Sequence, residues 1–365
     1  MHSPLSADKA VQSVKFHGKE TRITVDQDGY GGNVNQANLH AIRQLLPLLV
    51  FALAIPLSLR AADQPIVGIA GPAINMIYSF VGRDAGLFVK HGIDPKLVIF
   101  DSGSVLAQAA LAGDVKISVT SGPVTIATRT QGGDAILIAS FVNTPPYSIV
   151  AAKGITKWEQ LKGKRVAMSR FGSGTDTSLR LVLKKFGLDP AKDLMILQMG
   201  TQPSRYQALL AGNIDATIIS PPLDLIAKQQ GLNILVNIAE LGIPYPQQGI
   251  ETTDRMIREN PQMVKAFLKG YTEAVYYAAK NRELTKKLIV KYLKTTDPEI
   301  LEATVQSYVQ VTDYTGYPNL DGVRNAMDEV ALRLPAVKAK KPEDFVNTRF
   351  LKELEKEGFF KSLSK

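Results

Sequence analysis

QALLAGNIDATIISPP, residues 207–222, has a counterpart earlier in the chain, QAALAGDVKISVTSGP, residues 108–123. The two stretches align without a gap at an offset of 99 residues, and Gly132 and Gly231 keep that offset further on. Each is typical of a helix that ends at Gly, a buried strand, and a Ser followed by Pro where another helix begins. A unit seen only twice does not indicate a solenoid. The pair instead predicts one helix–strand–helix unit in each of two similar lobes.

Strands and helices alternate on both sides of each unit. Short apolar runs at 65–71, 96–100 and 135–141 alternate with helical patterns around the first unit, and runs at 164–169, 194–199 and 233–239 do so around the second. Strands that alternate with helices of ten or more residues are typical of a parallel sheet covered on both faces. We therefore predict the fold class α/β, in which each lobe is a doubly wound, mainly parallel sheet.

Two extended, Pro-rich stretches, residues 141–153 and 240–253, predict two crossings between the lobes. Beyond residue 253 nearly all of the chain carries apolar residues at helical spacing. Two crossings return the chain to the lobe in which it began. We therefore expect lobe one to comprise residues 63–143 and 245–365, with extra C-terminal helices, and lobe two to comprise residues 144–244.

A short apolar segment, LLPLLVFALAIPLSL at residues 45–59, follows Arg43 and precedes Ala61 and Ala62. A membrane span needs ~20 residues, so this segment favours an export signal cleaved after Ala61 or Ala62. We therefore expect residues 1–62 to be an N-terminal extension plus signal segment, and the protein to be periplasmic. The polar stretch ahead of the signal is unusual, and we expect a translation start placed too far upstream. The alternative is an uncleaved anchor with a cytoplasmic tail.

Composition excludes several kinds of site. The chain has 365 residues, is 45% hydrophobic and 21% charged, and has no cysteine, which excludes disulfides, thiolate metal sites and a cysteine nucleophile. Of its four histidines only His91 lies beyond residue 62, so we expect no metal site. The net charge is +9, but no basic run is interleaved with aromatic residues, so we expect no nucleic-acid partner. A basic balance weakly favours an anionic ligand.

The candidate ligand contacts lie where strands end. Ligands of open parallel sheets lie beyond the carboxyl ends of the strands, where helix N-termini bind anions. The alternative for Ser121 and Ser220 is that each only caps a helix, and if one does so we expect it to be Ser220. The strand ends and crossings together supply the predicted ligand-binding residues: Asn75, Ser121, Gly122, Thr144, Arg170, Gly172, Ser173, Gly174, Thr175, Asp176, Ser220 and Tyr245.

The Gly-rich turn RFGSGTD, residues 170–176, is the strongest single candidate because it follows a predicted strand and opens a predicted helix. Its glycines let the backbone approach a ligand, and Arg170 could pair with an acidic group. The turn lacks the Gly-Lys-Ser/Thr ending of a P-loop and the third glycine of a dinucleotide fingerprint. Asp176 either stabilises the helix N-terminus or faces a ligand ammonium.

Five stretches between about residues 65 and 360 share a pattern with one known family. They are VGRDAGLFVKHGIDPKLVIF (81–100), LAGDVKISVTSGP (111–123), ITKWEQLKGKRVAMSRFGSGTDTSLRLVLKKFGLDPAKDLMIL (155–197), LLAGNIDATIISPP (209–222) and KPEDFVNTRFLKELEKEGF (341–359). Together they resemble the nitrate/sulfonate/taurine family of solute-binding proteins, which has a branch for thiamine pyrimidine precursors.

The resemblance implies a type II periplasmic binding protein. Its two lobes would close on a small anionic or zwitterionic ligand, without a cofactor and as a monomer, and deliver it to the permease and ATPase of an ABC importer. One alternative is a pyrimidine-precursor synthesis enzyme of the same fold, with pyridoxal phosphate on a lysine and a nearby histidine. The synthetic members use a cysteine-rich motif and an active-site histidine, from which this chain departs. The other alternative is a receptor subunit that senses the ligand.

Overall fold

The computed structural model describes residues 11–16, 19–24, 63–71, 73–74 and 77–364. The chain divides into two units, Met1–Ala61 and Ala62–Lys365. In the first unit, β1 (Val11–Phe16) and β2 (Lys19–Thr24) pair antiparallel. The predicted export signal at 45–59 lies outside the described residues. None of the helices in the described ranges combines the length and hydropathy that a membrane span requires.

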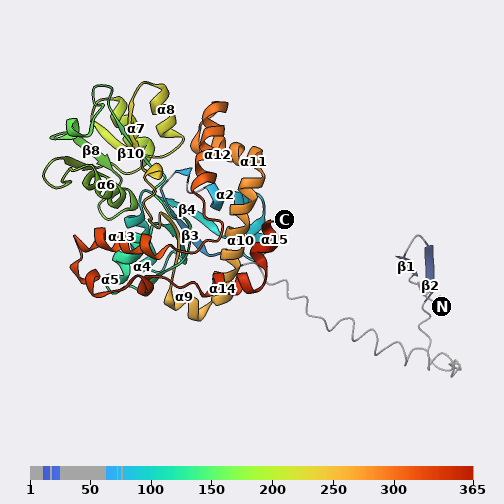
Figure 1. Ribbon diagram of the computed structural model, residues 1–365. Coiled ribbons are helices and arrows are strands. Elements are labelled where there is room, and N and C mark those ends of the chain that lie inside the picture. Colours follow the sequence, from blue (N-terminus) through green and yellow to red (C-terminus); the bar gives the residue numbers. More distant parts are fainter. Residues whose placement is uncertain (1–10, 17–18, 25–62, 72, 75–76, 365) are drawn as a thin grey trace, which may run out of the picture. The chain divides into compact units, whose positions relative to one another are not determined.

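The larger unit contains two five-stranded sheets (Figure 1). The first sheet has the order β4-β3-β5-β12-β6. In it β3 pairs parallel with β4 and β5, whereas β12 runs antiparallel between β5 and β6. Its strands are β3 (Ile66–Ala70), β4 (Lys96–Phe100), β5 (Ile117–Thr120), β6 (Ala135–Val142) and β12 (Gln248–Thr253).

The second sheet repeats this arrangement, with the order β11-β7-β10-β8-β9. Here β8 pairs parallel with β9 and β10, and β7 runs antiparallel between β10 and β11. Its strands are β7 (Ser148–Ala151), β8 (Arg165–Met168), β9 (Met195–Gln198), β10 (Ala216–Ile219) and β11 (Asn233–Asn237). The two repeated stretches fall at equivalent places, since one contains β5 and the other contains β10. The predicted α/β fold is therefore confirmed.

The two Pro-rich crossings differ from the prediction in one respect. Each ends in a strand that enters a sheet as its antiparallel member, β7 after the first crossing and β12 after the second. The sequence of β12, QGIETT, includes a glycine and polar residues, so it lacks the apolar run by which the other strands are recognised. The sheets are therefore mixed rather than wholly parallel.

Helices follow the strands of both sheets. After the first-sheet strands come α2 (Ile77–Asp84), α3 (Leu87–Lys90), α4 (Gly103–Leu111) and α5 (Gly122–Thr130). After the second-sheet strands come η2 (Trp158–Leu161), α6 (Gly174–Lys185), α7 (Gln202–Leu210), α8 (Leu223–Gln229) and η3 (Ile238–Leu241). Ser102, Ser173 and Thr201 cap α4, α6 and α7, each accepting a backbone N–H through its hydroxyl.

The chain beyond β12 is helical, as its periodicity predicts. Its elements are α9 (Asp254–Glu259), α10 (Pro261–Lys280), α11 (Arg282–Leu293), α12 (Pro298–Val311), α13 (Leu320–Ala331), η4 (Pro335–Ala339), η5 (Pro342–Phe345), α14 (Arg349–Lys356) and α15 (Phe359–Ser364). Of these, α10 packs on α2 and α3, α13 packs on α5, and α14 packs on β6.

Each sheet has its own core. Val67 and Ile69 of β3 are fully buried with Phe267 and Tyr271 of α10. Val166 and Met168 of β8 are buried in a separate cluster with residues of α6. The polar strand ends between these cores are therefore held in place by packing on both sides.

Candidate ligand-binding site

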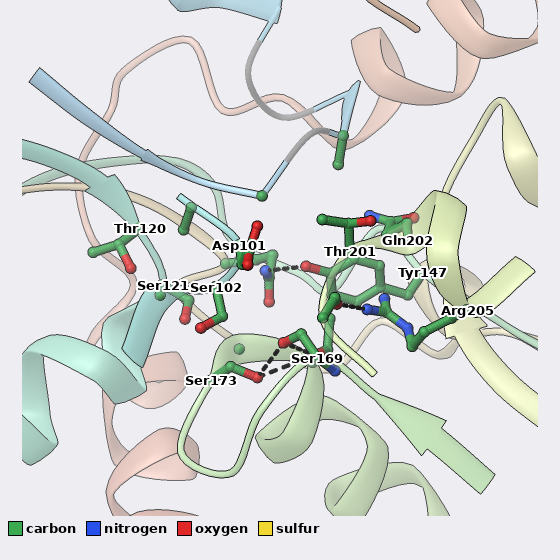
Figure 2. Close-up of a pocket in the computed structure, with 18 residues that line it drawn as sticks. Asp101, Ser102, Thr120, Ser121, Tyr147, Ser169, Ser173, Thr201, Gln202 and Arg205 are labelled. Atoms are coloured by element: carbon green, nitrogen blue, oxygen red, sulfur yellow. Dashed lines mark hydrogen bonds between the residues drawn. The ribbon is translucent and has the colours of Figure 1, made fainter. Parts of the chain in front are cut away.

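A pocket lies where the carboxyl ends of strands from both sheets meet, as expected for open parallel sheets (Figure 2). Its cavity measures about 40 Å³, which is room for roughly three water molecules. The enclosed space therefore suits a small group. Its lining residues are Ala70, Gly71, Ala73, Asp101, Ser102, Gly103, Thr120, Ser121, Tyr147, Ser169, Ser173, Gly174, Thr175, Gly200, Thr201, Gln202, Arg205 and Gln247.

Three hydroxyls from the Gly-rich turn and the end of β8 form one side of the pocket. Ser169 Oγ donates to Ser173 Oγ (2.7 Å), and Ser169 Oγ also lies 2.7 Å from Thr175 Oγ1 (Figure 2). Ser173 Oγ and Thr175 Oγ1 are 3.1 Å apart, and all three side chains are buried. Each hydroxyl can donate or accept, so the cluster can adjust its protons to a ligand.

Ser121 lies across the pocket from this cluster and approaches it closely. A Cβ placed on Gly174 would lie 2.6 Å from Ser121 Oγ and 2.9 Å from Ser121 Cβ, so a larger residue there would force the two sides of the pocket apart or displace Ser121. Ser121 is the N-cap residue of α5, yet its hydroxyl makes no capping hydrogen bond. The backbone N–H of Gly122 donates to the carbonyl of Pro246 (2.7 Å), so that donor is already used within the protein.

Arg205 brings a positive charge to the pocket. It is 1% exposed, and its guanidinium donates to Thr217 Oγ1 (3.2 Å), to the carbonyl of Ile218 (2.9 Å) and to the carbonyl of Gly200. Within the described ranges no Asp or Glu is paired with it, and burial lowers its pKa to about 10. Three of its five N–H groups are used in these bonds. A buried cation without a counter-ion is costly, so the pocket favours an anion.

Gln202 lies one helical turn before Arg205 on α7 and also lines the pocket. Its Oε1 accepts the backbone N–H of Ser220 (2.7 Å) and the hydroxyl of Ser220 (3.1 Å). The amide NH2 is then the group left to donate toward a ligand. Ser220 therefore orients Gln202, and Pro222 rather than Ser220 is the N-cap residue of α8.

The crossing segments add a tyrosine and a glutamine. Gln247 donates from Nε2 to the hydroxyl of Tyr147 (2.6 Å), and both side chains are buried. Burial raises the pKa of Tyr147 to about 12, which the nearby Arg205 charge partly opposes. Tyr147 therefore stays neutral and keeps a hydroxyl in the pocket.

The structure brings together four of the predicted residues, Ser121, Ser173, Gly174 and Thr175, on the pocket wall. Asn75 lies outside the described residues. The remaining predicted residues are not among the lining residues in the described part of the chain: Gly122, Thr144, Arg170, Gly172, Asp176, Ser220 and Tyr245.

Several of these residues have other roles. Asp176 is fully buried and accepts from the N–H of Gly172 (2.9 Å) and from Arg180 Nε (2.7 Å). It therefore stabilises the conformation of the Gly-rich turn and does not line the pocket. Tyr245 is fully buried in a cluster with residues of α13. Arg170 is exposed.

The sequence reasoning missed the residues that follow β9. Gly200, Thr201, Gln202 and Arg205 stand at the carboxyl end of a parallel strand and in the first turns of the next helix. The rule that selected Ser121 and Ser173 applies equally to them. The signal was present in TQPSR, residues 201–205, which contains a helix cap, a proline and a charged residue.

Comparison with known proteins gives relatives of two kinds. A candidate binding protein of Brucella abortus is 28% identical over 221 residues, which cover 59% of this chain and 66% of that protein. A candidate ABC transporter periplasmic binding protein of Brachyspira hyodysenteriae is 25% identical over 64% of this chain and 71% of its own length. A 4-amino-5-hydroxymethyl-2-methylpyrimidine phosphate synthase of Candida albicans is 27% identical over 54% of this chain and 62% of its own length. The chain thus spans just under two thirds of the length of the first curated relatives it matches.

Solved structures share the fold. The alkanesulfonate-binding protein SsuA of Xanthomonas axonopodis pv. citri, bound to MOPS, superposes with a TM-score of 0.63 at 17% identity. The superposition covers 77% of this chain and 95% of SsuA. The described chain therefore has the periplasmic-binding-protein fold. The family described as NMT1/THI5 like matches residues 73–284, more than half of the chain, and the chain belongs to that family.

Proposed function

We propose that the protein is the extracytoplasmic solute-binding component of an ABC importer and captures a small anionic solute. The observation that carries the proposal is Arg205, a buried guanidinium that has no acidic partner among the described residues and lines a pocket between the two sheets. The hydroxyls of Ser121, Ser169 and Thr175 and the amide of Gln202 would complete the anion's hydrogen bonds.

Capture would occur by closure of two lobes. In this proposal lobe one comprises residues 63–143 and 245–365, and lobe two comprises residues 144–244. Ser121 then belongs to lobe one, and Ser173 and Arg205 belong to lobe two. A ligand that contacts both lobes gains all of its hydrogen bonds only in the closed form, so it shifts the population toward closure.

Partner and location follow from the same proposal. The Brachyspira relative is named as part of an ABC transporter and as periplasmic. We accordingly propose delivery to a membrane permease and its ATPase from the periplasm, with the segment at 45–59 acting as the export signal. Fusing residues 1–62 to a reporter that is active only outside the cytoplasm should give activity, and a reporter that remains inactive would contradict export.

Calorimetric titration with a panel of small solutes tests the binding role. The panel holds nitrate, acetate, ethanesulfonate and butanesulfonate, with tetramethylammonium as a cationic control. At least one anion should bind at a 1:1 ratio and reduce the radius of gyration measured by small-angle X-ray scattering. Binding only of the cation, or of no anion at all, would contradict the proposal.

The enzyme alternative is favoured by one observation, the relationship to the Candida albicans synthase. Pyridoxal phosphate would need a lysine in the site, and a histidine donor would need to be close to it. The polar side chains that line the described pocket carry hydroxyl, amide, guanidinium and carboxyl groups, with no lysine or histidine among them. His91 lies elsewhere, paired with Glu273 at 2.7 Å. Protein purified with pyridoxal phosphate should therefore show no Schiff-base absorbance band, and such a band would favour the synthase.

A further inference from the structure

Helix α6, which carries the Gly-rich turn at its start, packs against α13 from the C-terminal region (Figure 1). Leu181 of α6 packs on the apolar cluster formed by Val323, Met327 and Val330 of α13. In the two-lobe division proposed above, α6 belongs to lobe two and α13 to lobe one. Their contact is therefore made between lobes.

Two ion pairs cross this contact. Arg333, just after α13, places Nη1 3.4 Å from Oδ2 of Asp176. Lys184, near the end of α6, places Nζ 2.8 Å from Oε1 of Glu329. Both carboxylates are buried, at 0% and 7% side-chain exposure, whereas their cationic partners are partly exposed. Burial of the two acids reduces the solvent screening of each pair, and removing either cation would leave a buried carboxylate with one partner fewer.

Asp176 connects this contact to the pocket. The oxygen that faces Arg333, Oδ2, also accepts the N–H of Gly172 (2.9 Å). Gly172 has a φ of +81°, and Arg333 Nη1 lies 3.1 Å from the point where a Cβ on Gly172 would stand. The next residues along the turn, Ser173 to Thr175, line the pocket. Arg333 therefore contacts the Gly-rich turn on the side away from the pocket, while Ser173 to Thr175 line the pocket.

We infer that Arg333 is a positioning residue that acts through Asp176. Through this contact, closure of the lobes would fix the conformation of the Gly-rich turn. The inference rests on the proposed two-lobe closure. When the lobes close, Arg333 reaches Asp176 and Gly172 and fixes the turn in its binding geometry. When they open, Asp176 keeps Arg180 as its partner, so the turn stays folded but loses its contact with Arg333. The pair Lys184–Glu329 adds to the closed form without touching the turn.

The test measures closure without any ligand. Because the chain has no cysteine, spin labels can be placed at Leu111→Cys on α4 and Leu210→Cys on α7, two exposed residues at equivalent positions of the repeated units. Double electron–electron resonance then measures the distance between the two spin labels, one on each proposed lobe. Arg333→Gln should lower the ratio of closed to open molecules about fivefold, and added salt should move the unsubstituted protein in the same direction.

Two further variants separate the roles. Arg324→Gln, on the exposed side of α13 with Asp321 as its neighbour, is the matched control and should leave the distance unchanged. Lys184→Gln should shift the distance but leave the turn intact, whereas Arg333→Gln should also speed amide exchange of Gly172. Both Arg333→Gln and Lys184→Gln leave the ion pair between Asp176 and Arg180 in place, so both proteins should fold normally.

An unchanged distance distribution in Arg333→Gln would overturn the inference, as would equal amide exchange at Gly172 in the two variants. These readouts do not depend on which solute binds, so they remain informative if the anion panel fails. If the panel succeeds, Arg333→Gln should weaken affinity about fivefold and Arg333→Lys should restore part of the loss.

Discussion

Arg205 is the residue on which the proposed anion specificity depends. Its guanidinium is held by two backbone carbonyls and one hydroxyl, which fix its plane without neutralising its charge. The sequence placed hydroxyls at the strand ends but could not single out Arg205, because an arginine in a helix is most often a surface residue. Its burial results from packing between α7 and β10, which is set by the tertiary fold.

Removing this charge should abolish tight binding. Arg205→Met should weaken the affinity for the best anion of the panel about 10- to 100-fold, since a hydrogen bond to a charged group contributes about 1.5–3 kcal/mol. Arg205→Lys keeps the charge but loses the fork of donors, so a smaller loss is expected. Titration calorimetry measures both, with circular dichroism as a check on folding. Equal affinities in all three proteins would contradict the assignment.

A second buried charge, Glu251 of β12, has a different consequence. Burial raises its pKa to about 7, against partial opposition from the hydroxyls of Thr125 and Ser118. A carboxyl with a raised pKa in the folded state stabilises the protein below its unfolded value near 4.5 and loses this contribution as the pH rises through about 7.

Glu251→Gln should therefore become more stabilising as the pH rises. Relative to the unsubstituted protein, its free energy of unfolding should gain up to about 3 kcal/mol between pH 5 and pH 8. Urea denaturation at the two pH values measures the change. Glu159→Gln, at an exposed position, should show no such trend. A constant difference for Glu251→Gln would exclude the predicted titration.

At the scale of elements, the alternation of apolar runs predicted the strands from β3 to β6 and from β8 to β11, because each is a short, largely apolar run with turn residues at its ends. It did not identify β7 and β12 as strands. Their sequences follow prolines at Pro145, Pro146 and Pro246, and such prolines indicate loops. What makes them strands is the pair of neighbouring strands on either side, which local sequence does not specify.

Helix α13 packs directly on the second crossing. A Cβ on Gly322 would lie 2.8 Å from the backbone nitrogen of Tyr245 and 3.0 Å from the carbonyl carbon of Pro244, neither of which can rotate away. Gly322→Ala should therefore lower the free energy of unfolding by about 1–3 kcal/mol despite the better helix propensity of alanine. Urea denaturation measures this. Gly154→Ala, where nothing lies within 4 Å, is the control, and equal stability of both variants would refute the packing argument.

At the scale of the whole molecule, the lobes are proposed to close at the point where Gly174 meets Ser121. The repeated units predicted two lobes with sites facing each other, and the pocket does draw residues from both sheets. The ligand itself could not be predicted, because it depends on which few side chains meet across the cleft.

A methyl group on residue 174 should keep the two proposed lobes from closing fully. Gly174→Ala would place Cβ 2.6 Å from Ser121 Oγ, so the closed form should be destabilised and affinity reduced at least about tenfold. Small-angle scattering should show an open form even with saturating anion. Adding Ser121→Gly removes the clash and should restore closure, but not full affinity. Normal closure in Gly174→Ala alone would contradict this account.

The most direct test of the central claim is a crystal structure of the protein with the anion that binds best in the panel. The account predicts anion oxygens within about 3 Å of the Arg205 guanidinium, with further hydrogen bonds from Ser121 on one lobe and the Ser169–Thr175 cluster on the other. An anion bound away from Arg205, or held by residues of one sheet only, would contradict it.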